Sequence, residues 1–239
     1  MLVEKTIVDG VCRLTLNRPE QHNTINRAML EELSAALVKI EREAKIIVLA
    51  GNGSSFCAGA DMKELFDASG RQLASFSVLG KKVCAQLEAL TIPTIAVLQG
   101  HTLGEGIELA LSCDIRVASD KTTFEFPQVK MGYAPGFGGT KKLPALIGKA
   151  RALELLITGL AFDTRSAIML GLINQSVHHK QLDKRVDDLV KLLMSYDSLA
   201  VSAIKHLVNS GEFIKETAYF SEQASTPEAK LKIKESLGE

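Results

Sequence analysis

Apolar and polar residues alternate over the first part of the chain, which predicts two strands at residues 2–8 and 11–16. Asp9-Gly10 lies between them and favours a tight hairpin turn. The apolar spacing then changes to the three-to-four-residue period of a helix over residues 26–43. A short apolar run at residues 45–50 predicts a buried strand that ends in a glycine-rich turn.

The same alternation of strands and helices continues through most of the chain. We expect strands at 94–98, 114–118 and around Val177, and helices near 62–67, at 71–90, from the Gly104 turn to Ser112, at 145–158 and at 164–171. This order predicts crossover connections and a largely parallel sheet, that is, an α/β fold. From residue 181 onward the pattern is helical, so we expect a core over 1–180 and a helical region over 181–239.

Composition and charge exclude several classes of function. The 239 residues include 28 basic and 28 acidic side chains, so no net field attracts nucleic acid or an anionic membrane. No segment approaches the roughly 20 apolar residues that span a bilayer. The four cysteines have no CxxC spacing and no histidine cluster beside them. We therefore expect no metal site, and reduced thiols in a cytoplasmic protein.

The first candidate site is the stretch Phe56-Cys-Ala-Gly-Ala-Asp61. Gly59 permits unusual backbone angles, and the alanines on either side keep the side chains small. A ligand can therefore approach the main chain closely, with the Ala60 amide facing an oxygen. A plain connection between a strand and a helix accounts for the same residues, and this alternative stays open.

The second candidate is Gly100-His-Thr-Leu-Gly-Glu-Gly-Ile-Glu108, which follows a predicted strand and opens a predicted helix. Free amides in the first turn of a helix stabilise an oxyanion such as an enolate. Glu108 lies one turn further on the same face, where a carboxylate can move protons beside that oxyanion. Its apolar neighbours make an unused glutamate costly, although a salt-bridged glutamate remains the alternative. His101 is interpreted as a structural histidine or a ligand contact.

A third stretch runs from Phe124 through Gln128 to Gly132, and Pro135-Gly-Phe-Gly-Gly139 follows it. Its prolines and glycines restrict a loop that can form one wall of a pocket. Local sequence alone favours the simpler interpretation of a connecting loop.

Together, in this order and at these distances, the three stretches resemble the enoyl-CoA hydratase/isomerase (crotonase) superfamily. The resemblance covers about residues 1–175, including Leu14–Glu20, Cys113–Arg116, Met131–Leu143 and Ala152–Asn174. It implies a ββα spiral core with a C-terminal helical region used in trimer formation, and a homotrimer or hexamer. It also implies an acyl-CoA substrate with no cofactor beyond the coenzyme A that the substrate carries.

By motif position, the resemblance implies an oxyanion hole made by the backbone amides of Ala60 and Glu105, with Glu108 as the acid/base. The implied substrate-binding positions are Gln21, His22, Asn23, Ala58, Gly59, Asp61, Gly104, Gln128 and Gly132.

Two positions depart from the family pattern. Glu105 replaces a usual glycine, and its amide can serve the hole if its side chain turns away. Gln128 replaces the second glutamate of the hydratases and cannot exchange a proton as a carboxylic acid does.

Two alternative functions remain open. Gln99-Gly-His101, Asn23–Asn26 and Gly132–Thr140 are similar to dehydratases or decarboxylases that act on polyketide intermediates bound to an acyl carrier protein. The second alternative is a binding protein that keeps the fold without the chemistry, and Gln128 is its main support.

Overall fold

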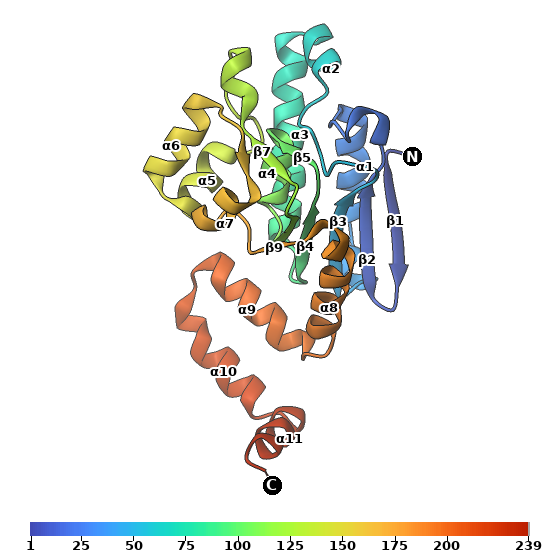
Figure 1. Ribbon diagram of the computed structural model, residues 1–239. Helices are drawn as coiled ribbons and strands as arrows, with labels where there is room; N and C mark the ends of the chain where they lie inside the picture. The colour runs from blue at the N-terminus through green and yellow to red at the C-terminus, as the bar shows by residue number, and fades with distance from the viewer. Residues whose placement is uncertain (239) are drawn as a thin grey trace.

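The computed structural model describes residues 1–238 and has a six-stranded sheet at its centre, in the order β1-β2-β3-β4-β6-β9 (Figure 1). β1 and β2 form the predicted antiparallel hairpin, and every other neighbouring pair in this sheet is parallel. The strands are β1 (Val3–Val8), β2 (Val11–Leu16), β3 (Ile46–Gly51), β4 (Thr94–Leu98), β6 (Ile115–Ser119) and β9 (Gln175–Val177). The predicted α/β fold with a largely parallel sheet is therefore confirmed.

A second sheet of three short strands was not predicted. It consists of β5 (His101–Leu103), β7 (Thr123–Glu125) and β8 (Phe162–Asp163) in that order. β5 pairs with β7 in parallel, and β7 pairs with β8 in antiparallel register. Two or three residues are too few to show an alternating pattern of apolar and polar residues, so these strands could not be predicted from the sequence.

The α-helices of the spiral part are α1 (Arg27–Leu37), α2 (Met62–Asp67), α3 (Gly70–Ala89), α4 (Glu105–Ala110), α5 (Gly139–Ile147), α6 (Lys149–Thr158) and α7 (Thr164–Leu170). Single 3-10 turns lie at η1 (Pro19–Gln21), η2 (Ile40–Arg42), η3 (Pro127–Met131) and η4 (His179–Gln181).

Two predicted helices have different bounds in the structure. The helix expected at 26–43 ends at Leu37, because Val38 is extended and Lys39 takes a left-handed backbone angle. The helix expected at 145–158 is two helices, α5 and α6, separated by Gly148.

The middle strands of the central sheet, β3, β4 and β6, are buried on both faces. Along β3, Ile47 and Leu49 belong to the large apolar cluster that includes α1 and α3, whereas Ile46 and Val48 belong to a second cluster with α8 (Leu182–Met194). This alternation explains why β3 reads as a continuous apolar run. Burial on both faces makes the sheet a rigid support for the loops at its strand ends.

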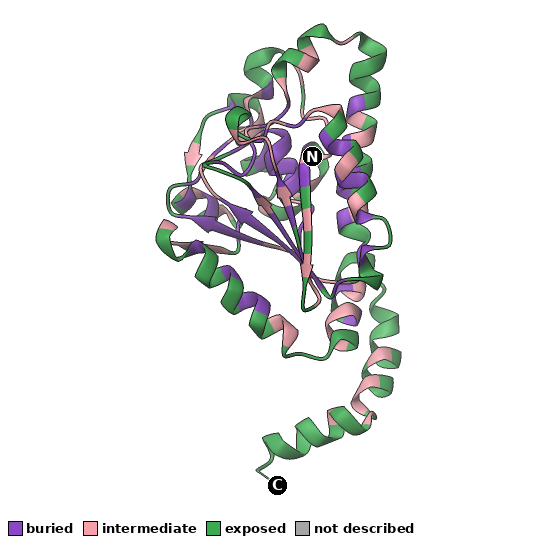
Figure 2. Ribbon diagram, turned by 90° about the vertical axis from the view of Figure 1, so that its right-hand side faces the viewer, coloured by how far each residue is buried: buried purple, intermediate pink, exposed green. Residues whose placement is uncertain are grey.

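The chain ends in the helical region that the sequence predicted, which continues from α8 through α9 (Ser198–Ser210), η5 (Phe213–Lys215), α10 (Glu216–Ala224) and α11 (Pro227–Ser236). Lys205 anchors α9 to the core, since its ammonium donates to Asp114 at 2.7 Å and to the Ile92 carbonyl at 2.9 Å. Figure 2 shows that α10 and α11 extend away from the core and are largely exposed.

Two further expectations concern the membrane and the cysteines. Within residues 1–238, no helix combines the length and the apolar character needed to cross a membrane. All four cysteines, which lie within these residues, are buried and free, as expected for reduced thiols.

Candidate active site

The Cys57 segment and β5, far apart in the sequence, run side by side and bring the first two candidate stretches together. The Cys57 N–H donates to the His101 carbonyl at 3.1 Å, and the Leu103 N–H donates to the Cys57 carbonyl at 2.9 Å. Gly106 permits this close approach, because a Cβ there would lie 2.5 Å from the Cys57 carbonyl oxygen. The Ala60 loop is thereby held beside the Gly104 turn and the start of α4.

The other side of the Ala60 loop is held by the segment that precedes α1. The Ala58 N–H donates to the His22 carbonyl at 2.9 Å, and the Ile25 N–H donates to the Gly59 carbonyl at 2.8 Å. The Asp61 N–H returns to the Ile25 carbonyl at 2.8 Å. Main-chain bonds on both sides leave the Ala60 amide little freedom.

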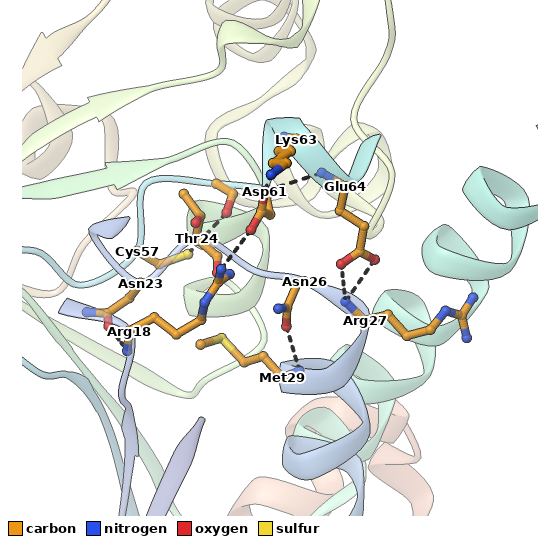
Figure 3. Close-up of polar contacts among 11 residues, drawn as sticks. Arg18, Asn23, Thr24, Asn26, Arg27, Met29, Cys57, Asp61, Lys63 and Glu64 are labelled. Atoms are coloured by element: carbon orange, nitrogen blue, oxygen red, sulfur yellow. Dashed lines mark hydrogen bonds and ion pairs between the residues drawn. The ribbon is translucent and has the colours of Figure 1, made fainter. Parts of the chain in front are cut away.

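Side chains add to this support, as Figure 3 shows. The Arg18 guanidinium pairs with the Asp61 carboxylate at 2.8 Å, and Asp61 also caps α2. The Arg18 hydrogen bond lowers the pKa of Asp61, against the effect of burial. Glu64 on α2 accepts the Arg27 N–H at 3.0 Å, which ties α2 to the start of α1.

The amide of Ala60 faces a carboxyl group, and that carboxyl is the side chain of Glu105. The Ala60 N–H donates to Glu105 Oε2 at 3.0 Å, so this side chain lies at the amide expected to line the oxyanion hole. Burial raises the pKa of Glu105, and hydrogen bonds, including the one from Ala60, act in the opposite direction. The condition stated from the sequence, that this side chain turns away from the hole, is therefore not met in the structure.

Glu108 lies one helical turn beyond, and its side chain is fully buried. Its Oε1 accepts the N–H groups of Phe137 at 2.8 Å and Gly139 at 2.6 Å. Burial, and next the nearby Glu105 carboxyl, raise the pKa of Glu108 to about 7. A carboxyl group with this pKa can both accept and donate a proton near neutral pH.

The second carboxyl oxygen of Glu108 has no hydrogen-bond partner among residues 1–238. An unpaired buried oxygen costs roughly 1–3 kcal/mol. Such a cost is acceptable at a position where a substrate proton or a water molecule completes the hydrogen bond. The exposed or salt-bridged glutamate considered from the sequence does not describe this residue.

Gln128 belongs to the same cluster. It lies on η3, is 1% exposed, and places its Nε2 3.4 Å from Glu105 Oε1. Its Oε1 has no hydrogen-bond partner within the described part of the chain. Gly104 leaves room for this side chain, since a Cβ there would lie 3.0 Å from Gln128 Nε2.

The remaining sequence-predicted positions have mixed roles. Asn23 is buried and donates to the carbonyls of Asn52 and Ser55, so it shapes the loop. Gln21 and His22 are exposed beside it. Gly132 ends η3 in a left-handed conformation, at the end of the turn that carries Gln128.

The sequence did not identify the groups that hold Glu108. They are backbone amides of Phe137 and Gly139, so no side-chain type marks them. The available signal was the glycine density of Pro135–Gly139, for which local sequence favoured a connecting loop over a pocket wall. Gly139 is required here because a Cβ would lie 2.9 Å from Glu108 Oε1.

Among residues 1–238, Asp120, His178 and His179 can each offer one ligand atom to a metal ion, within 4.8 Å of one another. Asp120 already accepts the His179 N–H at 2.8 Å, and the His178 ring accepts the Lys180 N–H. These contacts give the group a structural role on the surface, and it shares no hydrogen bond with Glu105 or Glu108.

Comparisons with known proteins agree with this geometry. A family model described as enoyl-CoA hydratase/isomerase matches residues 6–236. A short-chain-enoyl-CoA hydratase of Clostridium acetobutylicum is 36% identical, over 84% of this chain and 78% of the relative. A crotonyl-CoA hydratase of Syntrophomonas wolfei is 35% identical, over 83% and 77%.

Solved structures extend the likeness to the whole fold. An enoyl-CoA hydratase subunit from Geobacillus kaustophilus superposes with a TM-score of 0.91 at 32% identity, over 100% of this chain and 95% of that one. A Thermobifida fusca structure in complex with CoA gives a TM-score of 0.85 at 29% identity, over 94% and 95%.

Proposed function

The chain belongs to the enoyl-CoA hydratase/isomerase family, and on this premise we propose that Ala60, Glu105 and Glu108 form its catalytic centre. Its function is of the enoyl-CoA hydratase/isomerase type, with acyl-CoA as the substrate. The observation that carries the proposal is the Ala60 amide lying beside an oxygen-bearing group at the start of α4, with the buried carboxyl of Glu108 one turn further on. The enzyme names of the relatives also speak against a binding protein without chemistry.

In the proposed mechanism, the thioester oxygen of the substrate takes the place now held by the Glu105 carboxylate. The two amides then donate to an oxygen that becomes negatively charged as the enolate forms, which lowers the barrier. Removing one such donor from an enzyme typically costs two to three orders of magnitude in rate.

Glu108 moves the protons. In hydration, the water oxygen bonds to the β-carbon, and the electron pair of the double bond moves towards the thioester oxygen. Glu108 takes a proton from that water and gives this proton to the α-carbon as the enolate collapses, so the carboxyl returns to its starting state. In isomerisation, Glu108 takes a proton from one carbon and returns it to another, with no water consumed. A pKa near 7 suits both directions of transfer.

We propose that the rest of the acyl-CoA lies along Gln21–Asn23 and Ala58–Asp61. Gln21 and His22 are exposed and can contact the carrier, whereas Ala58 and Gly59 keep the main chain accessible. Asn23 and Asp61 act as supports, since their side chains already bind Ser55 and Arg18. The alternative of a substrate held by an acyl carrier protein remains a prediction.

We also propose that the chain assembles as a homotrimer or hexamer through its helical region. The support is the exposed apolar surface of α9 and α10, where Ile204, Val208 and Phe220 line one groove of about 530 Å³. Ile204 and Phe220 are 63% and 75% exposed in the single chain, which is unusual for large apolar side chains grouped together.

Crotonyl-CoA hydration tests the function directly, followed as loss of the conjugated enoyl absorbance. We expect turnover well above the rate in buffer, and a higher rate for Gln128→Glu if this position lacks only a second carboxyl group. A wild-type rate equal to buffer would contradict the hydratase proposal. Titrations of acetyl-CoA and of an acetylated acyl carrier protein distinguish the two carriers, because the proposal predicts tighter binding of the CoA ester.

A further inference from the structure

We propose that the Glu105 side chain is a specificity-determining residue that competes with the substrate's thioester oxygen for the oxyanion hole. The inference rests on the proposed function, because it assumes that the Ala60 and Glu105 amides bind the thioester oxygen. It adds a role for a side chain where only the backbone amide was expected to act.

The contact that carries the inference is direct. Glu105 Oε2 accepts the Ala60 N–H at 3.0 Å. This N–H is one of the two donors that the thioester oxygen needs in the proposed mechanism. A single amide hydrogen makes one good hydrogen bond at a time, so the carboxylate and the thioester oxygen exclude one another.

The space around the carboxylate leads to the same conclusion. Glu105 is 4% exposed, and a Cβ at Gly59 would lie 3.3 Å from its Oε2. The site has no room for a second oxygen beside Ala60 while Oε2 occupies it. Substrate binding therefore requires the Glu105 side chain to move.

Gln128 offers the displaced carboxyl a partner. Its Nε2 is already 3.4 Å from Glu105 Oε1, and its Oε1 has no hydrogen bond within residues 1–238. A Glu105 carboxyl that leaves the Ala60 amide can strengthen its contact with Gln128 Nε2. When protonated, it can also donate to Gln128 Oε1. A buried polar pair of this kind reduces the cost of opening the hole.

Competition of this kind acts on substrate affinity. Every acyl group must first displace a carboxyl oxygen that already accepts the Ala60 N–H, and breaking that hydrogen bond costs free energy. The penalty falls on any ligand that brings a carbonyl oxygen to the hole. It does not fall on coenzyme A itself, which has no acyl oxygen.

Binding of acetyl-CoA and of free CoA, measured by calorimetry, tests the inference. Glu105→Ala keeps the backbone amide and removes the competitor, so we expect acetyl-CoA to bind about tenfold more tightly. The affinity for free CoA should change by less than about twofold, since CoA lacks the oxygen that competes. In turnover, KM should fall, because the competing carboxyl no longer opposes substrate binding before the chemical step.

Two further variants support the test. Glu105→Gln preserves the size of the side chain with a neutral acceptor, and it should tighten acetyl-CoA binding by a smaller factor of about three. This variant also takes the place of Glu105→Ala in the test if Glu105→Ala does not fold. Glu154→Ala removes an exposed glutamate on α6 and should alter neither affinity.

The inference is wrong, and the proposed function is unaffected, if neither Glu105 variant binds acetyl-CoA more tightly than the wild type while the wild type binds CoA normally. A parallel gain for CoA and acetyl-CoA would also overturn it, because the effect would not depend on the acyl oxygen. If the wild-type protein binds neither ligand, the proposed function fails and the inference fails with it.

Discussion

The segment around α4 and the tail α9–α11 differ in what they bury and what they expose. The segment around α4 buries acidic side chains, whereas the tail, which is largely exposed (Figure 2), leaves apolar side chains in water. Every residue of α4 is buried, including Glu105 and Glu108. In α10 and α11 no residue is buried. The tail instead exposes many large apolar side chains, namely Leu199, Ile204, Val208, Phe213, Ile214, Phe220, Leu231, Ile233 and Leu237.

The difference shows which contacts each region obtains from its own chain. Around α4, backbone amides from other loops satisfy much of the buried charge, so one chain assembles this centre. In the tail, apolar area stays in water. Each Å² of it that a partner covered would contribute about 25 cal/mol to the free energy of association. We infer that the centre is preorganised within a protomer, whereas the tail is completed by association.

The largest expected effect comes from Glu108→Gln, which keeps the shape of the buried group and removes its proton exchange. We expect kcat to fall at least about a hundredfold, a barrier increase of about 3 kcal/mol, with ligand binding nearly unchanged. Steady-state kinetics on the true substrate, with acetyl-CoA titrations, measure both. Full activity of this variant would show that Glu108 is not the acid/base.

The same substitution is expected to stabilise the fold in a pH-dependent way. The pKa of Glu108 is raised from 4.5 to about 7, so the folded wild type holds one more proton than the unfolded chain between these values. The contribution of Glu108 to the stability of the wild type is therefore greatest below pH 4.5 and falls as pH rises towards 7. The total loss is about 3 kcal/mol, since one pKa unit corresponds to about 1.4 kcal/mol.

Glu108→Gln lacks this loss, so its stability advantage should grow from pH 5 to pH 8 and then level off. Urea unfolding of both proteins at one fixed protein concentration measures the difference. A gap that is constant with pH would contradict the burial-based account of this carboxyl.

A smaller effect is expected from Gly139→Ala. Its Cβ would lie 2.9–3.1 Å from three side-chain atoms of Glu108, so the carboxyl must shift. We expect kcat to fall about tenfold, because misplacing an acid/base is costly. Gly70→Ala on α3 is the matched control, since nothing lies within 4 Å of its Cβ, and it should retain wild-type kinetics. Equal kinetics for both variants would show that the Gly139 contact is unimportant.

The smallest expected effect concerns the tail. Val208 is 77% exposed on α9, and Val208→Asp places a charge on the surface proposed for association. We expect its subunit dissociation constant to rise at least about tenfold, because an unpaired charge in an apolar interface is unfavourable. Sedimentation velocity over a concentration series detects this change. If the wild type is already monomeric at micromolar concentration, the tail does not self-associate.

Much of the fold could be predicted because its long elements carry clear periods. β4 occupies Thr94–Leu98 as predicted, and the hairpin at Asp9-Gly10 has the predicted strands. The short strands β5, β7 and β8 could not be predicted, since their pairing depends on contacts distant in the sequence. The division at residue 180 into a core and a helical region remains a prediction.

The site was predictable to the level of the backbone. Motif position led to the expectation that Ala60 and Glu105 lie together, and in the structure the Ala60 amide lies 3.0 Å from the Glu105 carboxyl, with Glu108 one turn further along α4. It could not show where the Glu105 side chain lies, because a rotamer depends on neighbours such as Gly59 and Gln128. Nor could it find the Phe137 and Gly139 amides, since every residue other than proline has one.

The short ladder between Cys57 and β5 has a consequence for how this protein can change. Because main-chain bonds hold the two halves of the site in register, the spacing between its two amide donors does not depend on which side chain residue 105 carries. Mutation at that position can therefore alter how tightly acyl thioesters bind while the donors stay in place. Directed evolution towards tighter acyl binding has an obvious first position to randomise.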